Sequence, residues 1–124
     1  MTMAGTGTNV GMDLAVLEGE VERLSDLEAI YRLRLTYCAF VNESHFDRLP
    51  ELFTADAQVD FGNELGSHHG RPALIAALTG LDRDMFAKIL SHGHVADISG
   101  DCAEGHLYIE GRLIVEGESF ITLG

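Results

Sequence analysis

Two histidines are the side chains of this chain best suited to move a proton near neutral pH. His92 and His94 are two residues apart in a stretch that alternates as a β-strand, so both are expected on the same face. An imidazole facing a cavity can act as a general acid or base, and we assign that role to His92, with His94 contacting the ligand. A polar pair at the end of a strand is the alternative interpretation.

A tyrosine and an asparagine near the end of a predicted helix complete the candidate site. Tyr37 lies on the apolar side of that helix, where its phenol could donate a hydrogen bond to a carbonyl or enolate oxygen. A core tyrosine with its hydroxyl satisfied internally is equally compatible with the pattern. Asn42 can orient a ligand but cannot accept a proton, and a helix C-cap is its alternative role.

Histidines on alternate strand positions can also ligate one metal ion. His68, His69 or His106 could complete such a site with His92 and His94. No other residues have ligand spacing, so we expect neither a metal nor another cofactor.

The elements that must position these side chains follow from hydrophobic periodicity. Ser25 or Asp26 is expected to cap the N-terminus of the long helix, and Pro72 suits the first turn of a later one. Helices are predicted at Met12–Glu22, Leu27 to about Asn42, Phe46–Phe53 and Ala73 to about Leu78.

The second half of the chain alternates as strands separated by turn residues. Strands are predicted at Ala57–Phe61, Lys88–Ile98, Ala103–Val115 and Glu118–Leu123, with a hairpin or loop at Gly62–Gly70. Leu107, Ile109 and Leu113 are expected on the inner face, and Glu110 and Arg112 on the outer face. Helices followed by antiparallel strands indicate an α+β fold.

Composition limits the domain count and the classes of partner. The chain has 124 residues and a net charge of -12, so it is one domain that repels nucleic acid and anionic membranes. Residues 1–12 are predicted to be a disordered leader without signal-peptide features, and residues 13–124 the domain. Two cysteines without a secretion signal favour the cytoplasm, although a Cys38–Cys102 disulfide stays open.

Several strings, taken in order, resemble the SnoaL-like branch of the nuclear-transport-factor-2-like superfamily. The resemblance covers roughly Leu24 to Leu123. The matching strings are Asp26-Leu-Glu-Ala-Ile, Tyr37 with Asn42, His45-Phe-Asp-Arg-Leu with Leu52-Phe-Thr-Ala-Asp, His69-Gly-Arg-Pro-Ala-Leu, Ser91-His92 and Gly100-Asp-Cys-Ala.

This resemblance implies a fold and an assembly. The fold would be a cone-shaped roll, with N-terminal helices packed in the concave face of a curved, mixed but mostly antiparallel sheet around an apolar pocket. It also implies a homodimer through the outer face of the sheet. The chain ends earlier than such domains usually do, so either a last strand is lacking or another chain covers the last strand present.

The resemblance also implies site residues. Dehydratases of this kind carry a Tyr and an Asp on the first helix and a His on a strand; Tyr37 and His92 match, while Asn42 falls at the Asp position. Phe61 falls at the position of a strand Tyr, and Gly111 at that of a further acid or His. Phe40 and Ile109 are expected to contact the ligand together with Asn42, Phe61 and His94.

Two functions follow from the residues and the resemblance. The first is binding of an apolar oxygenated molecule of polyketide, steroid or terpenoid type, with cofactor-free dehydration, isomerisation or cyclisation. The alternative is a non-catalytic ligand-binding or dimerisation module of the same fold.

Overall fold

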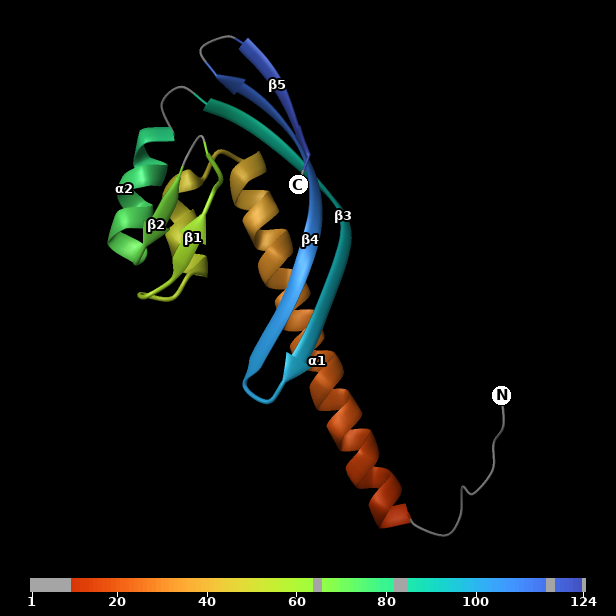
Figure 1. Cartoon of the computed structure of the whole chain (residues 1–124). Helices are drawn as coiled ribbons and strands as arrows, with labels where there is room; N and C mark the ends of the chain where they lie inside the picture. Colours follow the sequence, from red (N-terminus) through yellow and green to blue (C-terminus); the bar gives the residue numbers. More distant parts are fainter. Residues whose placement is uncertain (1–9, 64–65, 82–84, 116–117, 124) are drawn as a thin grey trace.

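The computed structural model describes residues 10–63, 66–81, 85–115 and 118–123. A long helix, α1 (Val10–Asn42), lies along a curved sheet, and a smaller group of elements gathers at its C-terminal end (Figure 1). The smaller group contains the 3-10 helix η1 (Phe46–Leu52), strands β1 (Gln58–Asp60) and β2 (Ser67–His69), and helix α2 (Arg71–Leu81). The sheet contains β3 (Met85–Ser99), β4 (Cys102–Val115) and β5 (Glu118–Leu123). The predicted α+β class is confirmed.

The first helix is longer than the sequence pattern predicts. It runs without a break from Val10, inside the predicted leader, to Asn42, so the predicted cap at Ser25 or Asp26 is wrong. Ser and Asp inside a helix cost only about 0.5 kcal/mol each relative to Ala. No Pro interrupts α1, and ion pairs Glu20–Arg23 (3.0 Å) and Glu28–Arg32 (2.8 Å) span the turns on either side of Ser25 and Asp26.

The predicted end of α1 is confirmed, and backbone geometry explains it. Ser44 has a positive φ of 60°, which turns the chain out of the helix. The Ser44 and His45 amides donate to the Val41 and Phe40 carbonyls at 3.2 and 2.7 Å, the two bonds of a Schellman motif. None of the described helices is long and apolar enough to cross a membrane.

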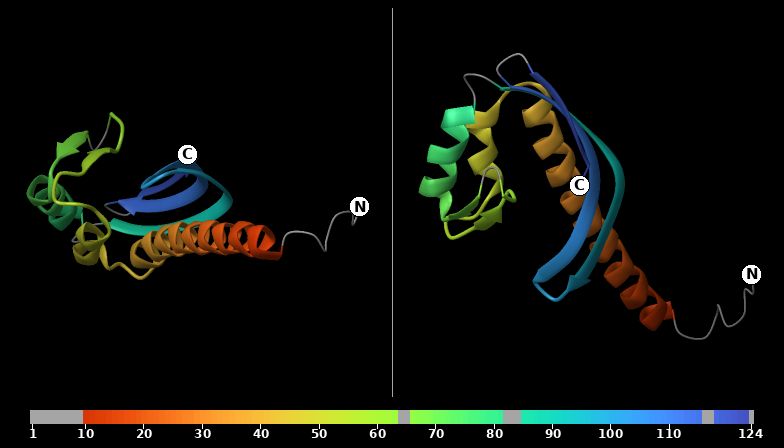
Figure 2. Two further views of the ribbon diagram at one scale, coloured as in Figure 1. Left: turned by 90° about the horizontal axis from the view of Figure 1, so that it is seen from below. Right: turned by 45° about the horizontal axis from the view of Figure 1, so that its top comes forward.

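The main sheet is antiparallel in the order β3-β4-β5, and β1 and β2 form a separate antiparallel pair. One face of β3 and β4 lies against α1, and the sheet arches over the helix (Figure 2). Buried Ala87 and Ile89 and half-buried Leu107, Ile109 and Leu113 mark this inner face. The predicted inner position of Ile109 is therefore confirmed, as is the outer position of exposed Arg112.

A β-bulge changes the faces of β3 halfway along its length. Ser91 pairs with Ile109 and Gly93 pairs with Tyr108, so His92 is an extra residue without a partner in the ladder. Alternation before the bulge puts the odd-numbered residues inward, and alternation after it puts the even-numbered residues inward. His92 and His94 therefore lie on opposite faces, and the prediction that they share one is wrong.

The core lies where α1, η1, α2 and the first half of β3 meet. Its buried members are Cys38, Phe40, Val41, Phe46, Leu49, Leu74, Leu78, Ala87 and Ile89. Each comes from a position that repeats at helical or strand spacing in the sequence, so the pattern and the packing agree there. The core surrounds the C-terminal half of α1, while the N-terminal half runs past the β3–β4 hairpin (Figures 1 and 2).

Candidate functional site

A cavity of about 120 Å³ lies within this core, between α1 and the inner face of the sheet. It is lined by Tyr37, Val41, Phe46, Leu49, Phe61, Leu78, Ala87, Ile89, Ile109 and Leu113. Three of the residues predicted to form the site therefore meet here: Tyr37, Phe61 and Ile109. The helical and strand periodicities that predict the core also produce the other walls, although the sequence alone did not identify them as site residues.

Tyr37 is the one polar side chain among the residues that line the cavity. Burial raises its pKa above the usual value of 10.0, and the neighbouring Cys38 adds to the shift. The phenol is therefore protonated at neutral pH. Within the described chain its hydroxyl has no hydrogen-bond partner, so it is available as a donor to a ligand oxygen.

Asn42 performs a structural task beside the cavity. Its amide nitrogen donates to the Ile89 carbonyl at 3.0 Å, and its side-chain oxygen accepts the Ile89 amide at 2.6 Å. The Lys88 ammonium donates to its backbone carbonyl. These bonds fasten the end of α1 to β3, so the side chain predicted to contact a ligand is already engaged by the protein.

Phe40 is buried in the core but is not among the residues that line the cavity. The guanidinium of Arg48 lies 4.5 Å from the centre of its ring, at the end of α1. This contact ties η1 to α1 and helps to place Phe46 and Leu49 against the cavity. The structure therefore gives Phe40 a supporting position one layer behind the site.

His92 is on the outer face of the sheet, away from the cavity. Its Nε2 lies 3.1 Å from the Glu110 carboxylate, and its side chain is 56% exposed. The bulge produces this position, because the extra residue reverses the alternation that predicted an inward His92. The general acid or base role stays a prediction, and the geometry of the single chain does not favour it.

His94 is on the inner face but farther along the sheet than the cavity. Arg34 donates to its Nδ1 at 2.7 Å, and the ring of Tyr31 meets it edge to face at 5.1 Å between centroids. Because a guanidinium only donates, Nδ1 is the acceptor and the imidazole proton is on Nε2. Arg34 also donates to the carbonyls of Val95 and His106, at 3.2 and 2.8 Å.

Sequence reasoning missed this Arg34 contact, although one signal for it was present. A Cβ on Gly105 would overlap the Val95 carbonyl oxygen and lie 2.6 Å from Arg34 Nη2. A glycine within a strand often marks the close approach of another group, and here that group is an arginine from the helix.

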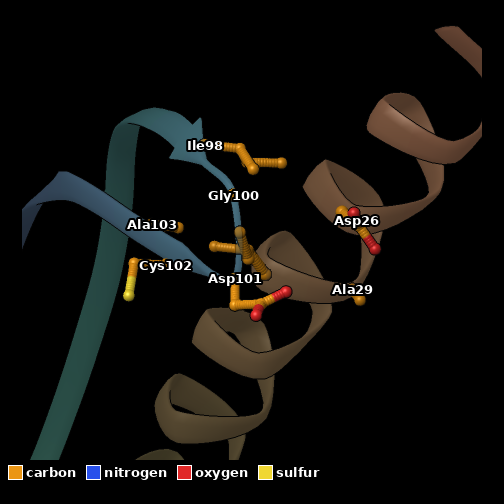
Figure 3. A pocket seen from close by; sticks show the side chains of 8 residues that line it. Asp26, Ala29, Ile98, Gly100, Asp101, Cys102 and Ala103 are labelled. Carbon is orange, nitrogen blue, oxygen red and sulfur yellow. The ribbon is translucent and has the colours of Figure 1, made fainter. Parts of the chain in front are cut away.

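A larger hollow of about 410 Å³ opens at the surface between α1 and the β3–β4 turn. Asp26 and Asp101 border it from opposite sides, with the Asp101 side chain reaching toward the helix (Figure 3). It contains none of the predicted site residues. No group of three or more His, Cys, Asp or Glu side chains that could hold a metal occurs in the described parts of the chain.

Comparison with known proteins gives one family and several solved structures. The model of the SnoaL-like domain matches residues 22–123. No curated protein matches the sequence. The chain is 21% identical to a protein of Novosphingobium aromaticivorans named provisionally as a scytalone dehydratase, with a TM-score of 0.73 over 82% of this chain and 70% of that one.

Two further structures have the same fold. An NTF2-like protein with a cystatin-like fold from Novosphingobium aromaticivorans is 20% identical, with a TM-score of 0.69 over 94% of this chain and 75% of that one. Rv3472 of Mycobacterium tuberculosis, a protein of unknown function, is 22% identical, with a TM-score of 0.67 over 79% of this chain and 60% of that one. At these identities the likeness establishes the fold.

Proposed function

Because this chain belongs to the SnoaL-like domain family, we propose that it binds a small, apolar, oxygenated molecule in the cavity beside Tyr37. The observation that carries the proposal is a protonated, unengaged phenol among nine apolar lining residues. Apolar walls with one well-placed polar group are the usual composition of a small-molecule site.

The size of the cavity limits what can enter it. A dry cavity of about 150 Å³ with aliphatic and aromatic walls accepts benzene. At about 120 Å³ the present cavity suits a single ring, or one ring of a larger polyketide, steroid or terpenoid. Larger ligands require the walls to move apart.

The phenol supplies the specificity in this proposal. In a largely apolar pocket, a neutral donor with no described partner favours a ligand that brings a carbonyl or hydroxyl oxygen. A ligand lacking that oxygen leaves the hydroxyl unpaired. The expected preference is about fivefold, equivalent to about 1 kcal/mol for one neutral hydrogen bond.

Binding is favoured over the predicted dehydration, isomerisation or cyclisation because the cavity lacks a proton acceptor. Among the described residues that line it, Tyr37 alone can ionise, and burial raises its pKa. Asn42 is engaged with Ile89, and Gly111 brings no side chain to the inner face. The non-catalytic alternative therefore has the stronger support.

A matched pair of ligands tests the proposal. Cyclohexanone and methylenecyclohexane have nearly the same shape, but only the ketone accepts a hydrogen bond. Calorimetric titration of the protein should give about fivefold tighter binding of the ketone, and Tyr37→Phe should abolish that preference. Tyr31→Phe is the control, because Tyr31 is on the same helix but outside the cavity. Binding of neither ligand, or an unchanged preference in Tyr37→Phe, would refute the proposal.

We also propose that the chain forms a homodimer through the outer face of the sheet. Phe86, Leu90, Tyr108 and Ile114 are large apolar side chains with 41% to 61% of their surface exposed, and strand alternation puts all four on that face. Large apolar side chains exposed together on one face of a sheet are typical of interfaces. Leu90→Asp should shift the sedimentation coefficient from dimer to monomer, and a monomeric unmodified protein would refute the assignment.

A further inference from the structure

The N-terminal half of α1 has an apolar stripe that no other element covers. Leu14, Leu17, Val21 and Leu24 are 53% to 62% exposed. The part of this half that extends beyond the β3–β4 hairpin has nothing packed beside it (Figures 1 and 2). Isolated helices of this length are marginal in water, so a second surface against the stripe would stabilise the segment.

The spacing of the stripe is that of a helix-packing seam. The four residues are three, four and three positions apart, which places them within a sector of about 80° on the helix. Apolar residues repeated in this way form the contact line of paired helices. Val16 is equally exposed, at 61%, but lies about 120° from the centre of the stripe.

The stripe continues into a hollow in the surface. Leu24 also borders a groove of about 480 Å³ between α1 and β3. The other residues that line this groove are Leu27, Glu28, Tyr31, His94, Val95 and Ala96. The apolar surface therefore extends from Leu14 to the side of the sheet, and its far end is recessed.

The borders of the stripe are acidic. Glu18 lies on one side, and Asp13 and Glu20 on the other; Glu20 holds the nearby Arg23 at 3.0 Å. Residues 13–28 contain six acids and one base, within a chain of net charge -12. Two copies of this helix would bring like charges together along both borders, whereas a basic partner would pair with them.

Beyond the ligand binding proposed above, we propose that the stripe Leu14–Leu17–Val21–Leu24 docks a basic amphipathic helix of another protein. Its apolar residues would pack on the stripe, and its lysines or arginines would face Asp13, Glu18 and Glu20. This inference is independent of the cavity, since none of these residues lines it.

Two synthetic four-heptad peptides test the charge and the apolar contact together. Both carry Leu at the a and d positions; one carries Lys at e and g, the other Glu. Titrated against the full chain, the Lys peptide should bind at least tenfold more tightly than the Glu peptide. Its affinity should fall when sodium chloride is raised from about 50 mM to about 500 mM.

Matched variants locate the binding surface. Val21→Asp should weaken Lys-peptide binding at least tenfold, whereas Val16→Asp, with the same charge change at the same exposure, should change it less than twofold. Circular dichroism checks that both variants fold. If either variant does not fold, the difference in affinity between the Lys and Glu peptides for the unmodified chain tests the proposal. Equal binding of the two peptides, equal effects of the two variants, or self-association that Val21→Asp abolishes would each overturn the proposal.

Discussion

The side chain of Asn42 satisfies both backbone polar groups of Ile89. The last residue of α1 thus donates to the Ile89 carbonyl at 3.0 Å and accepts its amide at 2.6 Å, as a neighbouring strand would. These two bonds hold β3 at a fixed place on the helix, and Ile89 is one wall of the cavity. The site therefore depends on a residue that does not reach into it.

Asn42→Ala is expected to lower the free energy of unfolding by about 1–3 kcal/mol, because it leaves two partly buried backbone groups unpaired. Asn42→Asp should also destabilise the protein at neutral pH, since a carboxylate accepts the Ile89 amide but cannot donate to its carbonyl. Urea unfolding measures both, with exposed Glu43→Ala as the control. Equal stabilities of the unmodified protein and Asn42→Asp would contradict this role.

Tyr37 should make the stability of the folded protein fall at alkaline pH. Burial raises its folded-state pKa above 10.0, so its contribution is complete below that pH. The unfolded tyrosine then loses its proton first, and stability falls as pH rises through the folded pKa, by at most about 1.4 kcal/mol per pH unit. Between pH values of about 9.5 and about 11, the free energy of unfolding of Tyr37→Phe should fall less than that of the unmodified protein. At neutral pH it should match the unmodified protein within about 0.5 kcal/mol, since its hydroxyl has no described partner.

The two cysteines should differ sharply in reactivity. Both are free thiols in the structure, so the disulfide left open by the sequence does not form there. Cys38 is buried, and burial raises its pKa above 9.0, whereas Cys102 is exposed on β4. Because the thiolate is the reactive form, iodoacetamide at mildly alkaline pH should modify Cys102 first. Mass spectrometry of the native protein measures the order, and Cys102→Ser should remove the fast phase.

Gly105 and Gly19 should respond in opposite directions to the same substitution. Gly105→Ala puts a methyl group against the Val95 carbonyl and Arg34, and should cost about 1–3 kcal/mol of stability. Nothing lies within 4 Å of a Cβ on Gly19, which is inside α1. Gly19→Ala should therefore stabilise the protein by about 0.5–1 kcal/mol. Thermal unfolding compares the two, and a tolerated Gly105→Ala would contradict the close approach of the Val95 carbonyl and Arg34 to this position.

His92→Ala should leave ligand binding unchanged. The side chain is on the outer face and pairs with Glu110 at 3.1 Å in a solvent-exposed setting. Exposed pairs of this kind contribute about 0–1 kcal/mol, so the free energy of unfolding should change by no more than about 1 kcal/mol. A double-mutant cycle with Glu110→Ala measures the coupling. A loss of cyclohexanone binding in His92→Ala would contradict this prediction and show that His92 contributes to the ligand site.

Local periodicity in the sequence accounts for most of the fold. Helical spacing predicts the C-terminal half of α1 and the short helix at Phe46, and alternation predicts the long hairpin with Ile109 and Leu113 turned inward. The SnoaL-like resemblance adds the way these pieces pack. The local pattern fails at Ser25 and Asp26, because cap-forming residues are also tolerated inside a helix whose neighbouring turns carry ion pairs.

The sequence by itself therefore determined the element types, the apolar walls and the phenol of Tyr37, because these follow from residues only a few positions apart. Tertiary structure alone decided which polar side chains are available. An unpaired residue at His92 reverses the faces of β3, and Asn42 turns to Ile89, 47 residues away. A period-two pattern assumes an unbroken ladder, and a side chain's partner depends on which distant backbone groups packing leaves unpaired.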